Sequence, residues 1–60
     1  MTNMLWQYAP LSERMVVYDL YVDWENRTGQ RVYNDFEDFD EHHRNFSFNF
    51  VVNYWMKLDA

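Results

Sequence analysis

Residues 46–58 read FSFNFVVNYWMKL, and this stretch decides the fold. Apolar side chains recur at every second position, namely at Phe46, Phe48, Phe50, Val52, Tyr54, Met56 and Leu58. An α-helix would scatter these residues around its surface, whereas a β-strand would place all of them on one face. The alternation therefore predicts a strand over residues 45–58, which is longer than most strands of globular proteins.

A second alternating segment covers residues 15–25. One of its faces would carry only apolar side chains, those of Val16, Tyr18, Leu20, Val22 and Trp24. Alternation of β-branched and aromatic residues is typical of a half-buried strand. The polar sequence that follows predicts a tight turn with Gly29 in the left-handed region, after which residues 30–33 return as a strand. We therefore expect a β-hairpin over residues 15–34, preceded by an N-terminal arm or edge strand over residues 1–14.

An acidic segment, NDFEDFDEHH at residues 34–43, separates the two predicted strand regions. Its carboxylates come first and its histidines last, which is the charge order that a helix dipole favours. Asn34 is a suitable N-cap, and Glu37 stands three positions later, as in a capping box. These signals predict a helix over residues 35–44. The alternative is that the second strand continues through residue 35 or 36 and ends in a loop.

The predicted helix would carry one apolar stripe. Phe36, Phe39 and His43 fall within a sector of about 60°, because successive helical residues are 100° apart. Asn45 would then end the helix in the left-handed conformation. The predicted fold class is α+β: a single domain over residues 1–60, with a small antiparallel sheet made of the hairpin and the C-terminal strand, and with the short acidic helix packed on it.

Both long strands would also expose apolar side chains on the face turned away from the helix. An apolar patch of this kind usually marks an interface, so we expect a homodimer or a tight contact with a partner. The residues of this oligomer face are Val17, Tyr21, Val51 and Trp55. The alternative is that the N-terminal segment around Leu5 and Trp6 covers the patch.

Composition excludes several classes of protein. The chain has 60 residues and no cysteine, so disulfides and thiolate zinc sites are absent, and 13 aromatic residues are the means of stabilising so small a core. A formal net charge of −5 argues against direct binding to nucleic acid or to an anionic membrane. No apolar run approaches the length of a membrane span. With no secretory leader visible, we expect a cytoplasmic protein.

Catalysis and metal binding are not expected. Asp35, Asp38 and His42 would share one side of the helix, but on an exposed flank without supporting residues, so we predict no metal. A two-layer domain of this size has little room for a pocket, and its one glycine cannot form a phosphate-binding loop. We predict no catalytic residue and no cofactor. His43 should be a partly buried core residue and His42 a solvated end cap.

The remaining function is binding through charge. The expected partner-binding face combines the helix acids with three from the hairpin: Asp35, Glu37, Asp38, Asp40, Glu41, Asp19, Asp23 and Glu25. Carboxylates along a rigid helix imitate a row of phosphates and would attract a protein with a basic, nucleic-acid-binding surface. In type, the chain resembles small acidic bacteriophage proteins that inhibit host enzymes by DNA mimicry, which implies action in the host cytoplasm. The alternatives are charge that serves solubility alone, or an oligomer-forming accessory subunit that acts through its apolar sheet face.

Overall fold

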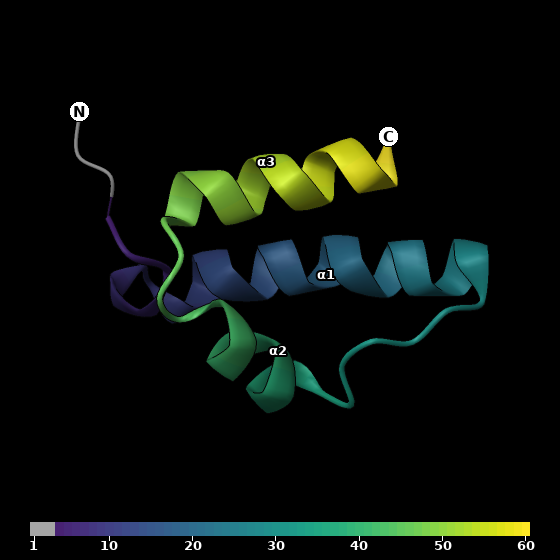
Figure 1. Cartoon of the computed structure of the whole chain (residues 1–60), viewed down its shortest axis with the longest axis horizontal. Helices are drawn as coiled ribbons and strands as arrows, with labels where there is room; N and C mark the ends of the chain where they lie inside the picture. The colour runs from purple at the N-terminus through teal and green to yellow at the C-terminus, as the bar shows by residue number, and fades with distance from the viewer. Residues whose placement is uncertain (1–3) are drawn as a thin grey trace.

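The computed structural model describes residues 4–60, and over this range the protein is built from helices (Figure 1). A short 3₁₀ helix, η1, spans Trp6–Tyr8 and is followed by α1 (Leu11–Thr28), α2 (Phe36–His43) and α3 (Phe48–Asp59). No strand occurs among the described residues, and the one bridge, between Leu5 and Ser47, is isolated. The predicted α+β class is therefore wrong.

The two long helices lie side by side and run in the same direction, as Figure 1 shows. The loop of residues 29–35 returns the chain along α1, so that α2 can pack on α1 and η1 before α3 begins. At the far end, the Arg27 guanidinium donates to the Leu58 carbonyl at 3.1 Å and pairs with Asp59 at 3.2 Å. The Arg27 guanidinium therefore lies beside the C-terminal ends of both α1 and α3, where the helix dipoles are negative.

The predicted strand over residues 45–58 is helix α3. Its most buried residues are Val51 and Trp55, which are one turn apart and which the strand prediction had placed on the outer face. The Ser47 hydroxyl caps the helix by accepting from the Phe50 N–H at 3.0 Å. Nine of residues 46–58 are apolar, so the segment offers an apolar side to a helix as well as to a strand. Packing against α1 decides in favour of the helix.

The predicted hairpin over residues 15–34 is replaced by α1 and the loop that follows it. Pro10 stands just before the helix, and Gly29 just after it, with a φ of 75° and its N–H on the Glu25 carbonyl at 2.8 Å. Gly29 thus takes the left-handed conformation that the sequence predicted, but it ends a helix and not a strand. Residues 30–33, expected as the returning strand, belong to the loop.

Of the arm predicted over residues 1–14, residues 11–14 begin α1, and residues 4–10 form no strand but are hydrogen-bonded to the chain before α3. The Trp6 N–H donates to the Phe46 carbonyl at 2.8 Å, and the Phe48 N–H donates to the Met4 carbonyl at 2.7 Å. These bonds tie the arm to the connection between α2 and α3, and Trp6 is completely buried. The first three residues of the predicted arm lie outside the described range.

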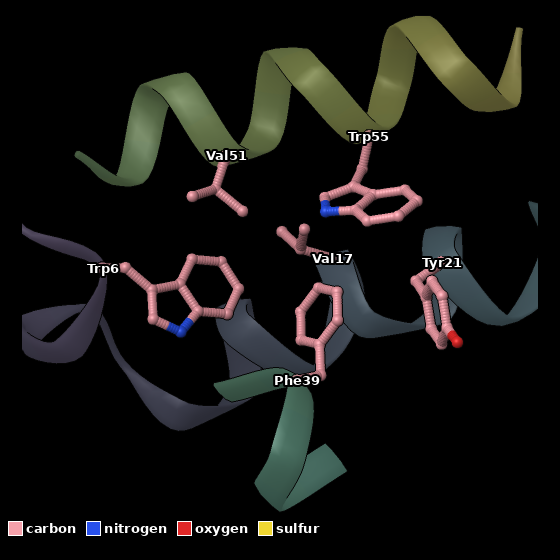
Figure 2. Close-up of a cluster of buried hydrophobic side chains, with 6 residues drawn as sticks. All are labelled: Trp6, Val17, Tyr21, Phe39, Val51 and Trp55. Atoms are coloured by element: carbon pink, nitrogen blue, oxygen red, sulfur yellow. The ribbon is translucent and has the colours of Figure 1, made fainter. Parts of the chain in front are cut away.

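The core joins side chains from η1, α1, α2 and α3, as Figure 2 shows: Trp6, Val17, Tyr21, Phe39, Val51 and Trp55. Tyr21 meets Trp55 edge to face, with 5.1 Å between the ring centroids. Large aromatic side chains bury much area each and so compensate for the short chain. The expected oligomer face is corrected by this arrangement, because Val17, Tyr21, Val51 and Trp55 are all interior residues.

The helix predicted over residues 35–44 is confirmed as α2, within one residue at each end. Its N-cap is Asp35 and not Asn34: the Asp35 carboxylate accepts from the Asp38 N–H at 2.9 Å. Of the predicted stripe, Phe39 and His43 are buried and Phe36 is only partly buried. Asn45 is not left-handed, since no described residue other than Gly29 has a positive φ.

Candidate functional site

The acidic surface of α2 consists of Asp35, Glu37, Asp38, Asp40 and Glu41. Because Phe39 and His43 are turned into the core, these carboxylates lie on the remaining faces of the helix. They line an open depression of about 630 Å³, together with Gln7, Arg14, Asn34 and Arg44. The structure thus brings the five predicted residues of the helix together around one hollow.

Asp40 is committed to contacts within the protein. Its carboxylate accepts two bonds from the Arg14 Nη1, at 2.7 and 2.9 Å, and a third from the Trp6 indole Nε1 at 2.7 Å. The side chains of Arg14 and Asp40 are only 17% and 29% exposed. These bonds fasten α2 to α1 and η1, so Asp40 holds the acidic surface in place.

Asp38 and Asp35 serve the helix start. The Asp38 carboxylate accepts from the Asn34 N–H at 3.0 Å and lies 3.2 Å from the His42 Nδ1, while Asp35 is the cap. Glu37 and Glu41 differ, since no hydrogen bond or ion pair engages either side chain among residues 4–60. They are exposed and one turn apart, so they are neighbours on the helix surface.

The sequence predicted that the acids of α1 would join this surface, but the structure separates them from it. Asp19 is exposed and about 100° around the helix from Tyr18, whose ring contacts Phe39 of α2. Asp23 lies near the end of α1, where a hydrogen bond with the Asp59 carboxyl raises the pKa of Asp23. Glu25 pairs with Arg31 at 3.1 Å and accepts from the Tyr21 hydroxyl at 3.1 Å.

His43 joins α2 to α3 by a hydrogen bond that determines which ring nitrogen carries the proton. The Trp55 Nε1 is 3.2 Å from the His43 Nε2, and the His43 Nδ1 is 2.6 Å from the Phe39 carbonyl. An indole N–H only donates, so Nε2 accepts and Nδ1 carries the proton. Burial, the largest cause, lowers the pKa of His43 below its ordinary value. The prediction of a buried core histidine is confirmed.

A row of three half-exposed aromatic side chains, Phe46, Phe50 and Tyr54, follows the outer side of α3. We call it the aromatic row. Its neighbouring rings are nearly parallel, at 27° and 23°, with centroids 5.6 and 6.3 Å apart. Beside it lies a groove of about 250 Å³, lined also by Tyr33, His43 and Val51. Sequence reasoning missed this surface because it turned these rings inward; their spacing of four residues was the signal available.

Residues 4–60 contain neither a cluster of metal-ligand side chains nor a helix that could cross a membrane. Asp35, Asp38 and His42, considered together as ligands, do not form a cluster that could hold a metal ion within residues 4–60. Over the same residues, none of the helices combines the length and the apolar composition needed to cross a membrane. Comparison with protein-family models, with curated proteins and with solved structures found no match to this chain.

Proposed function

We propose that this protein is a small binding protein that presents the acidic surface of α2 to a basic surface on a protein partner. The observation that carries the proposal is the pair Glu37 and Glu41, exposed and one turn apart, with no partner side chain among residues 4–60. The flanking carboxylates of Asp35 and Asp38 extend the same negative region. A net charge of −5 adds attraction at long range for a basic partner.

The acidic surface is held rigidly, which supports recognition of a defined pattern of positive charge. Phe39 anchors α2 from within, and the Asp40 carboxylate ties it to Arg14 and Trp6. A helix backbone held in this way loses little conformational freedom when a partner binds. Basic residues that normally hold the phosphates of DNA or RNA would find a similar row of negative charge here.

The proposed activity is therefore inhibition, in which the protein competes with nucleic acid for one basic surface. It involves no reaction and no cofactor. A partner that binds nucleic acid places the action in the cytoplasm, and the absence of cysteine fits a reducing compartment. Charge that serves only solubility is the competing explanation, and it predicts no partner that depends on Glu37 or Glu41.

The test compares three forms of the protein as bait in a lysate of the source cells: the native chain, the double variant Glu37→Gln/Glu41→Gln, and Asp19→Asn as a matched control on α1. We expect the native chain and the control to retain the same basic protein and the double variant to lose it. Added DNA or RNA should release that protein. If the double variant still retains the protein and added nucleic acid does not release it, the proposal is overturned.

A further inference from the structure

Charge is segregated in this molecule. Every Asp, Glu, Lys and Arg falls within residues 13–44 or 57–59, so residues 45–56 carry no formal charge. Residues 4–12 are uncharged as well, and the backbone bonds of Trp6 and Phe48 tie the two segments together. One region of the surface therefore lacks charge in a protein that is acidic elsewhere.

The aromatic row is the most apolar part of this region, and it borders a groove. Phe50, in the middle of the row, remains 54% exposed, which leaves much of a large apolar ring in water. The groove beside it is lined by Tyr33, His43 and Val51 as well as by the row. A ridge and a groove thus lie side by side on the same face.

We propose that a second copy of this chain covers this face, and that the two copies are related by a two-fold axis. In such a pair the aromatic row of each copy enters the groove of the other, because a two-fold interface uses the same patch twice. A ridge with an adjacent groove is what self-complementarity requires. The exposed carboxamides of Asn49 and Asn53 lie beside the row and can both donate and accept across the axis.

The distribution of charge favours a second copy over other occupants. Two molecules of net charge −5 repel each other wherever carboxylates meet, but the face from residue 45 to residue 56 offers none. Lys57, the cation of α3, lies about two turns beyond Phe50 at the centre of the row, so two copies in antiparallel contact keep their lysines apart. A strongly basic partner would instead gain nothing from this face.

The area of the face sets the strength of the pair. Three half-exposed rings contribute roughly 300 Å² per copy, whereas a stable interface buries about 800 Å² per partner. Further area comes from Asn49, Asn53 and Tyr33, but the total stays below that of a stable interface. The pair is therefore a weak, reversible dimer, and it does not rest on the proposed function of α2.

Sedimentation equilibrium of the whole chain tests the dimer, at protein concentrations from about 10 μM to about 1 mM, which bracket weak association. The apparent mass should rise from one chain toward two. Phe50→Asp should abolish this rise, Phe50→Ser should weaken association at least about tenfold, and Phe50→Leu should keep most of it. Higher salt should not weaken the dimer, since no ion pair holds it and the net repulsion is screened.

Leu11→Asp is the matched control. Leu11 is exposed, and it lies in the sector of α1 that also holds Arg14 and Tyr18, both of which face α2 and not α3. This variant should associate as the native chain does, and circular dichroism should show that all variants remain helical. A native chain that is monomeric at the highest concentration overturns the dimer. Association that survives Phe50→Asp, or that Leu11→Asp abolishes equally, overturns it as well.

Discussion

Helices α2 and α3 pack on the same core but present opposite chemistry to solvent. α2 buries Phe39 and is then fastened by polar groups, with Asp40 bound to Arg14 and Trp6. α3 buries Val51 and Trp55, and its outer side carries rings and carboxamides. In a chain of this size, α2 is therefore fastened at its edge by the Asp40 contacts, whereas α3 is held mainly by apolar area, with the Arg27 contacts at its end.

This difference predicts how the attachment of each helix should respond to pH and salt. Ion pairs and charged caps respond to pH and salt, whereas burial of apolar area responds mainly to a change in side-chain volume. The two helices meet at a single side-chain hydrogen bond, from Trp55 to His43, so a change in either one is felt at that bond. The following substitutions separate the two kinds of attachment.

Removing the α3 anchor should have the largest effect. Trp55→Ala deletes a buried indole and leaves a cavity beside Tyr21, at a cost of about 3–5 kcal/mol. A chain of this length has a total stability of roughly 3–9 kcal/mol, so most molecules should be unfolded or close to it. Urea titration followed by circular dichroism measures the loss. Met56→Ala, at an exposed neighbour, should stay within about 0.5 kcal/mol of the native chain.

Breaking the polar attachment of α2 should cost less. Asp40→Ala removes the acceptor shared by the Arg14 Nη1 and the Trp6 indole N–H, while the Arg14 Nε keeps its bond to the Ala9 carbonyl. For a pair that is partly exposed we expect a loss of about 1–3 kcal/mol. Glu37→Ala, on the same helix, should change the free energy of unfolding by no more than about 0.5 kcal/mol. Equal losses at the two positions would contradict the structural role assigned to Asp40.

The two helix caps offer a closer comparison. Ser47→Ala and Asp35→Ala each remove the side chain that accepts an N–H of the first turn, that of Phe50 in α3 or Asp38 in α2, and each should cost about 1 kcal/mol. Only Asp35 also places a charge at the helix dipole, so only its contribution should shrink as salt is added. Denaturant titrations at low and high salt measure both. Identical salt dependence would show that the charge of Asp35 contributes nothing.

The last prediction concerns the protonation of His43, which joins α2 to α3. The pKa of His43 is below its ordinary value because burial disfavours the imidazolium, and protonation would also place an N–H against that of Trp55. The unfolded chain then binds the proton more readily. Stability should therefore be constant above about pH 6.5, fall as the pH drops below that value, and level off once folded molecules are protonated too.

His43→Gln should flatten this dependence between about pH 5 and 7.5, because the amide oxygen still accepts from Trp55 but does not titrate. His42→Gln is the control and should leave the dependence intact, since His42 is exposed. Urea midpoints across this range give the comparison. If His42→Gln flattens the curve and His43→Gln does not, the buried pair is not the group that titrates.

Sequence reasoning found α2 because its signals agree with one another. Carboxylates at the start, histidines at the end and phenylalanines three residues apart all indicate a helix, and together they favour it over the strand and loop. The cap was misplaced by one residue, since Asn34 and Asp35 are equally good cap residues by type. Their difference depends on which carboxylate reaches the Asp38 N–H, a matter of backbone geometry.

The same reasoning failed for α1 and α3 because their residues favour strands locally. Valine and aromatic residues have high strand propensity, and alternation among nearly continuous apolar residues does not determine a period. Pro10 and Gly29, which enclose α1, and Ser47 before α3 were the available helix signals. Tertiary packing overrode the local preference in both helices.

The candidate site could be predicted only in part. Five acids on one helix were evident, but the distinction between Asp40 and Glu37 depends on Arg14, which is 26 residues away in the chain. Predicting the aromatic row would have required knowing that α3 is a helix. Predicting the burial of Trp55 would have required knowing where α1 lies. Such facts follow from the arrangement of whole helices and not from neighbouring residues.

The core also has a consequence for how the chain can be divided. Trp6, Val17 and Tyr21 come before the loop of residues 29–35, and Phe39, Val51 and Trp55 come after it, so neither half contains a core of its own. Formation of native structure should be all-or-none. A single cut within that loop should yield two unfolded fragments, and their helices should return only when both are mixed, to an extent that increases with fragment concentration.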